Sequence, residues 1–152
     1  MIESWIDKLA AVWAFALDDF TTVQSIAIIE GAHYPKTINA AGKFPIALTM
    51  PTGLSPQYTA SGTRLSWRGE TQIYVTPNVD NSAMPSLPRW YGKILTAAAA
   101  NITLDGTVTN FYIPDEPDAI SLAVLQYNDE DAPHWGFVIR WFVTELAAVS
   151  VS

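Results

Sequence analysis

The chain has 152 residues, 49% of them hydrophobic and 15% charged, a size typical of one domain that buries about two thirds of its unfolded surface. It contains no cysteine, which excludes a disulfide framework, thiol catalysis and a zinc site with cysteine ligands. Eight basic and fifteen acidic residues give a formal charge of −7, which argues against a surface that neutralises nucleic-acid phosphates with clustered Lys and Arg.

The N-terminal segment Met1–Phe20 predicts an amphipathic helix, because its apolar residues recur at steps of three and four. Its uninterrupted apolar run, Leu9–Leu17, is much shorter than the roughly 20 residues that span a bilayer. Acidic residues flank this run, whereas a secretory signal begins with basic residues. We therefore expect no export signal and no membrane anchor.

Two long segments, Thr63–Thr76 and His134–Leu146, alternate between apolar and polar residues. A period of two sends successive side chains to opposite sides of a sheet, so each segment predicts a strand with one apolar face. The residues expected mainly in the core are Trp67, Ile73, Trp135, Ile139 and Trp141.

Shorter elements complete the predicted fold. A second helix is expected from about Ser86 to Ala100, where apolar residues again recur at helical spacing. The further strand candidates are Val23–Ile29, Phe44–Met50, Ile120–Tyr127 and, as a short strand or an extended approach, Val108–Ile113. Two helices and one antiparallel sheet of about four or more strands make an α+β fold, with both helices on one face of the sheet.

Residues Pro51–Gly62 predict a long loop between two strands, because they include two Pro and two Gly and exceed the length of a tight turn. A long loop of this kind arches over a partner or is mobile. We expect it to act as a contact arm that contributes little to folding of the subunit. The interface residues predicted at and near this loop are Leu54, Pro56, Tyr58, Arg64 and Arg68.

No segment predicts catalysis or metal binding. His134 follows the acidic residues 129–131, but their spacing fits no EF-hand loop, and a solvated turn beside a histidine explains the pattern better. The acidic residues of Pro114–Asp118 are better explained by a surface loop than by a pair of glycosidase carboxylates. Nucleophile-elbow, Walker and dinucleotide-binding motifs are missing from the sequence. We expect no enzyme activity, no metal site and no cofactor.

The low charge instead indicates a surface that binds a partner, since ordinary domains contain about 25% charged residues. Six Trp, six Tyr and six Phe support this inference, because aromatic residues anchor interfaces. A Trp-rich core explains the aromatic residues equally well. Arg68 and Arg140 share the polar faces of two predicted strands, where pairing with Glu70 or Glu145 would contribute less than about 1 kcal/mol.

Five features follow one another along most of the chain: the helix Met1–Phe20, the segment Lys43–Leu48, the strand Ser66–Val75, the helix from Leu87, and a closing hairpin that ends in Val138–Val143. This order resembles that of the tail terminator (tail completion) proteins of long-tailed bacteriophages. The resemblance lies in element order and pattern, and no single residue is diagnostic. Gly31–Lys43 and Leu104–Asp118 are longer than in a minimal member of that family.

The resemblance implies a structural virion protein that forms a ring, expected to be a hexamer, on the head-proximal end of the tail tube. Such a ring stops tube polymerisation and provides the docking surface for the head and neck. The implied partners are further copies of the chain, the tail tube protein and the head–neck connector protein, with assembly in the host cytoplasm and residence in the virion tail. DNA would pass through the lumen without specific binding, because a net-acidic protein repels phosphate.

Other interpretations stay open. A neighbouring ring-forming neck or tube protein would show the same general features. A monomeric domain could bind a small ligand or a glycan through Pro51–Gly62 and exposed aromatic residues. A divergent hydrolase would need His134 and nearby acids, and loss of activity in His134→Ala would be its test.

Overall fold

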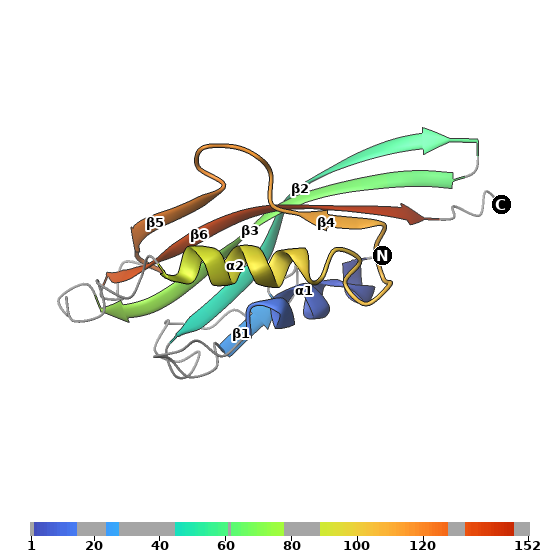
Figure 1. Ribbon diagram of the computed structural model, residues 1–152. Helices are drawn as coiled ribbons and strands as arrows, with labels where there is room; N and C mark the ends of the chain where they lie inside the picture. The colour runs from blue at the N-terminus through green and yellow to red at the C-terminus, as the bar shows by residue number, and fades with distance from the viewer. Residues whose placement is uncertain are drawn as a thin grey trace.

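The described residues of the chain form a mixed six-stranded sheet with two α-helices, which makes an α+β fold (Figure 1). The computed structural model describes residues 2–14, 24–27, 45–60, 62–77, 89–127 and 133–147. The elements are the 3-10 helix η1 (Ile2–Ser4), α1 (Ile6–Val12), β1 (Gln24–Ala27), β2 (Ile46–Thr59), β3 (Gly62–Pro77), α2 (Arg89–Ala99), β4 (Asn110–Tyr112), β5 (Ile120–Leu125) and β6 (His134–Ala147).

The sheet is built around β3 and β6. The strand order is β1-β2-β3-β6-β4, and β5 also pairs with β6. Along β6, β5 occupies the stretch from His134 to Ile139 and β4 the stretch from Phe142 to Thr144. The prediction of an antiparallel sheet is wrong at one edge, because β1 runs parallel to β2. Parallel strands need a connection of a dozen or more residues, and residues 28–45 separate these two strands.

The prediction of a long loop at residues 51–62 is also wrong, because β2 continues to Thr59. Its pairing with β3 runs from Ile46 opposite Tyr74 to Thr59 opposite Gly62, with one irregularity between Pro51 and Gly53. Thr59 Oγ1 donates a hydrogen bond to the Gly62 carbonyl oxygen at 2.8 Å, which closes the tight turn. Proline is tolerated here because β1 pairs with β2 only up to Thr49, so the rest of β2 is an edge strand of the described sheet.

The other predicted elements lie close to their expected positions. Strand β3 is one residue longer than predicted at each end, β6 is one residue longer at its C-terminal end, and α2 lies within the predicted second helix. The predicted first helix corresponds to η1 and α1 within residues 2–14, and its remainder lies outside the described residues. Residues 28–44, the acidic residues 129–131 and the predicted start of the second helix also lie outside them.

The main core cluster contains buried residues from both helices and from the central strands. Trp141 on β6 is fully buried, and its Nε1 donates to Thr71 Oγ1 at 3.2 Å. Thr71 Oγ1 in turn lies 2.9 Å from Thr49 Oγ1, so the polar atoms of Trp141, Thr71 and Thr49 are hydrogen-bonded to one another. Gly69 leaves room for the Trp141 ring, because a Cβ at that position would collide with it.

The predicted core assignment is confirmed for three residues and only partly for two. Ile73, Ile139 and Trp141 have no exposed surface. Trp67 and Trp135 are partly buried and pack against the same cluster. The ring of Trp5 makes edge-to-face contacts with the rings of Trp67 and Trp141, and the ring centroids are 5.8 Å apart in each pair. These contacts join the first residues of the chain to the middle of the sheet.

Candidate interaction surface

The most prominent surface feature is the arm, which we define as residues 51–60 and 62–68 of β2 and β3. Figure 1 shows the arm extending beyond the two helices, together with the end of β6. The pairing of β3 with β6 continues along the arm to Thr63 opposite Ala147, so β3 is supported on both sides. The arm is therefore a continuation of the sheet, and residues 51–59 of β2 span roughly 30 Å at about 3.3 Å per residue.

The arm divides the five predicted interface residues between its two faces. Residues that stand opposite each other in an antiparallel pair project to the same side. Leu54, Pro56 and Tyr58 stand opposite Trp67, Leu65 and Thr63, which defines the apolar face. Arg68 stands opposite Gly53 and Arg64 opposite Gln57, which defines the polar face. The structure therefore brings Leu54, Pro56 and Tyr58 together and places Arg64 and Arg68 behind them.

On the apolar face of the arm, the side chains of β3 are buried or partly buried and those of the edge strand β2 are exposed. Leu65 and Thr63 on β3 are buried, whereas Leu54 and Tyr58 on β2 are 41% and 80% exposed. A single exposed apolar residue is ordinary. Here Leu54, Pro56 and Tyr58 lie in one row, all exposed, at alternate positions of an edge strand. A row of this kind is a candidate contact surface.

The polar face carries two exposed arginines without ion-pair partners among the described residues. The side chain of Arg68 lies across Gly53, where any Cβ would collide with its Nε. Glycine at the irregularity of β2 therefore allows the arginine to lie flat on the neighbouring strand. Arg64 is closer to the tip, and Leu146, 60% exposed, is its partner on β6.

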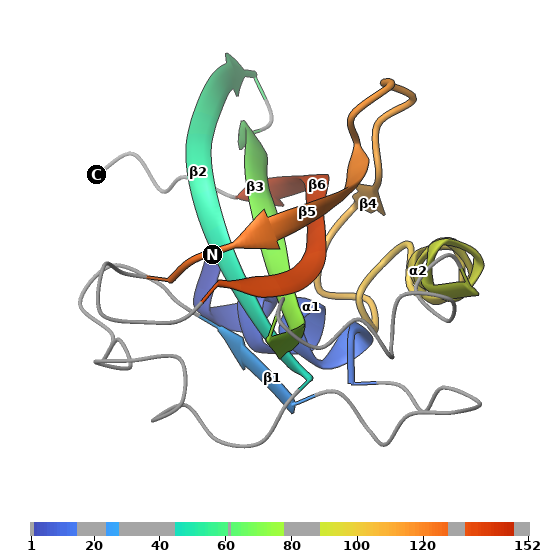
Figure 2. The same cartoon turned by 90° about the vertical axis from the view of Figure 1, so that its left-hand side faces the viewer.

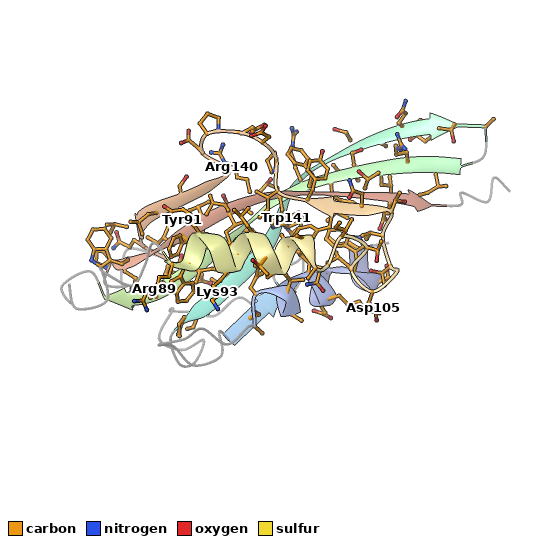
Figure 3. All side chains as sticks on the ribbon, viewed as in Figure 1. Arg89, Tyr91, Lys93, Asp105, Arg140 and Trp141 are labelled. Atoms are coloured by element: carbon orange, nitrogen blue, oxygen red, sulfur yellow. The ribbon has the colours of Figure 1, made fainter. Side chains whose placement is uncertain are left out.

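A hollow of about 260 Å³ lies beside the base of the arm, on the polar side. Arg68 and Glu70 come from β3 and Arg140 and Phe142 from β6, while Glu116 comes from the loop between β4 and β5. Figure 3 shows Arg140 next to that loop. Glu70 stands directly opposite Arg140 in the register.

Glu145 cannot form the ion pair with Arg68 or Arg140 that the sequence suggested. It stands opposite Leu65 and is buried, on the face of the sheet away from Arg68 and Arg140.

The acidic residues predicted on a surface loop do lie on one. Asp115, Glu116 and Asp118 are exposed in the connection between β4 and β5. Two backbone hydrogen bonds shape this loop, from Glu116 N to the Pro114 oxygen at 3.0 Å and from Ala119 N to the Glu116 oxygen at 3.2 Å. A third, from Arg140 N to the Ala119 oxygen at 2.8 Å, ties its end to β6.

Of the residues considered for catalysis, His134 is described and the acidic residues 129–131 lie outside the described residues. His134 is buried at the start of β6, with its ring 6.1 Å from that of Tyr74. The described residues contain no group of three His, Cys, Asp or Glu side chains that could hold a metal ion. Neither α1 nor α2, the helices of the described ranges, has the length and apolarity needed to cross a bilayer.

The sequence predicted the interface residues on the arm, but it predicted a loop where the structure has a continuous strand. The signal was present, because Leu54, Pro56 and Tyr58 alternate with Ser55, Gln57 and Thr59 in the pattern of a strand. Comparison with known proteins found no family model that matches this sequence and no similar curated protein. The arm, the hollow and the acidic loop are the surface features of the described residues from which a function can be inferred.

Proposed function

We propose that this chain is a structural subunit of a bacteriophage tail, which forms a closed ring on the head-proximal end of the tail tube. In that position it stops polymerisation of the tube and offers a docking surface to the head and neck. The observation that carries the proposal is the arm, a long extension of the sheet with an exposed apolar row and two exposed arginines. The order of the elements, which resembles that of tail terminators, supports the same assignment.

An arm of this kind suits a ring because ring contacts are heterologous. Each subunit uses one surface toward the next copy and a different surface toward the previous one, and the rotation between them fixes the number of subunits. We expect a hexamer. The arm provides a surface that projects beyond the subunit's own helices and can lie on a neighbour (Figure 2). In this proposal both helices cover one face of the sheet, and the polar face is left for contacts.

The composition is compatible with the lumen of a tail. DNA leaving the head must pass through the ring without being held, and a chain with a formal charge of −7 repels phosphate groups. The proposed role needs no catalysis, cofactor or metal. The proposed partners are further copies of the chain, the tail tube protein and the head–neck connector protein.

The test is removal of the gene from the phage that encodes it, followed by negative-stain microscopy of the tails. We expect overlong tails, or tails without heads, and restoration of both length and head joining when the protein is supplied. Tails of normal length that still join heads would refute the proposal. A protein that is found at another station of the neck or tube, with normal tail length in its absence, would support the neighbouring ring-former instead.

The hollow beside the arm favours a second candidate, a monomeric domain that binds a small anionic ligand. Arg68 and Arg140 line it without ion-pair partners among the described residues. However, its volume of about 260 Å³ is below the roughly 300–1,000 Å³ of typical ligand pockets, and Glu70 and Glu116 in the same lining oppose an anion. The mass of the protein in solution across a range of concentrations separates a monomer from a ring.

A further inference from the structure

The arm has the opposite charge from the rest of the chain. Residues 51–68 include Arg64 and Arg68 and no acidic residue. The remaining residues hold six basic and fifteen acidic side chains, a formal charge of −9. Both arginines lie on the polar face and are exposed. The arm of one copy is therefore attracted electrostatically to the body of another.

One part of the body concentrates the complementary charge. Residues 113–119 include Asp115, Glu116 and Asp118 and no basic residue. All three carboxylates are exposed, and the backbone hydrogen bonds of the loop, together with Pro114 and Pro117, hold its shape. A loop held in this way loses little conformational entropy when it binds.

The arm and the acidic loop do not neutralise each other within one subunit. Glu116 lines the hollow together with Arg68, yet the two do not form an ion pair. In Figure 1 the arm extends to the right, away from the loop between β4 and β5. Arg64 is near that tip, and its neighbours across the sheet are Gln57 and Leu146. Both surfaces are thus open to a second copy of the chain.

We propose that the polar face of the arm of one subunit binds the acidic loop of the next subunit. This contact joins two different surfaces of the same chain, so it is heterologous and can close a ring. The inference rests on the proposed ring and specifies which surfaces form its subunit contact. Charge pairs at the edge of an interface act mainly through orientation, association rate and salt dependence.

The experiment is a charge exchange between the two surfaces. The arm variant is Arg64→Glu with Arg68→Glu, and the loop variant is Asp115→Lys with Asp118→Lys; Glu116 is left unchanged because it lines the hollow. Self-association is measured by sedimentation velocity as a function of concentration. We expect each variant alone to associate about tenfold more weakly than the wild type. An equimolar mixture of the two variants should recover association, because each arm then meets a loop of opposite charge.

The matched control is Arg89→Glu with Lys93→Glu, which makes the same change in net charge on α2, away from the arm (Figure 3). This variant should associate like the wild type. Salt provides a second readout, since an increase from about 0.1 M to about 1 M shortens the Debye length from about 10 Å to about 3 Å. Wild-type association should weaken over that range, and that of the arm variant should change less. Circular dichroism and thermal melting verify that all variants are folded.

Several outcomes would overturn the contact. These are unchanged association of the arm variant, an equal loss in the α2 control, or a mixture that associates no better than its components. A wild type that stays monomeric at every concentration would also overturn it. Duplex DNA that binds the wild type and not the arm variant would assign the polar face to nucleic acid instead. None of these results changes the tail-length test, so failure of the contact and failure of the tail-capping role are distinguishable.

Discussion

Replacing Trp141 with alanine should destabilise the subunit strongly, because this side chain fills the middle of the main core. Trp141 has no exposed surface, and its ring lies over Gly69 and stands edge-on to Trp5. Removing a buried Trp or Phe costs about 3–5 kcal/mol through lost burial and the cavity left behind. The hydroxyls of Thr71 and Thr49 retain each other as partners, so an unsatisfied polar group adds little to this cost.

The expected change in melting temperature follows from the size of the domain. For a chain of this length, 1 kcal/mol corresponds to roughly 2–4 °C, so Trp141→Ala should melt about 6–20 °C lower than the wild type. Thermal unfolding followed by circular dichroism measures this shift, and Trp67→Ala, at a partly buried position of the same face, provides a comparison with a smaller expected loss. If Trp141→Ala melts within about 2 °C of the wild type, the assignment of Trp141 to the core is refuted.

Four further variants test other parts of the structure. Tyr58→Ala should change the unfolding free energy by less than about 0.5 kcal/mol, because the side chain is 80% exposed. The same variant should weaken ring assembly measured by sedimentation. A destabilised monomer would instead show that Tyr58 supports folding. Gly69→Ala should lower the free energy of unfolding in chemical denaturation by about 1–3 kcal/mol, because its Cβ would collide with the Trp141 ring and the Met50 carbonyl. Gly92→Ala on the open surface of α2 should raise the free energy of unfolding by roughly 0.5–1 kcal/mol. Thr71→Val should cost about 1–3 kcal/mol, since the indole N–H loses its acceptor; a stability equal to the wild type would mean that water takes over this role.

The structure also changes the expected effect of shortening the arm. As a loop, residues 51–62 would contribute little to folding through closure entropy alone. As the edge strand beside β3, they cover a strand that carries the buried residues Thr63 and Leu65. Exposed substitutions such as Tyr58→Ala therefore separate contact from folding better than a deletion does.

Local sequence patterns determined the long strands, because the side-chain alternation of a strand is a property of consecutive residues. The observed β3 is one residue longer than predicted at each end, and β6 is one residue longer at its C-terminal end. The predicted apolar side of each strand contains most of its buried residues, while Tyr74 and His134 are buried on the other side. The helical spacing of α2 was similarly visible. The exposed acidic loop followed from its prolines and carboxylates, which are unfavourable inside either a helix or a strand.

Pairing between residues that are far apart in the sequence determined the strand arrangement and the faces of the sheet. The parallel position of β1 and the continuation of β2 through Pro51 and Pro56 depend on which strand lies alongside, and local propensity cannot encode a neighbour. Register also decided that Leu54 and Arg68 occupy opposite faces of one arm, since the face of each side chain is set by its cross-strand partner. The hollow exists because β3, β6 and the loop between β4 and β5 meet in space, although Arg68, Arg140 and Glu116 lie far apart in the sequence. The sequence by itself determined which residues form strands and helices, and only the tertiary structure determined which surfaces those residues share.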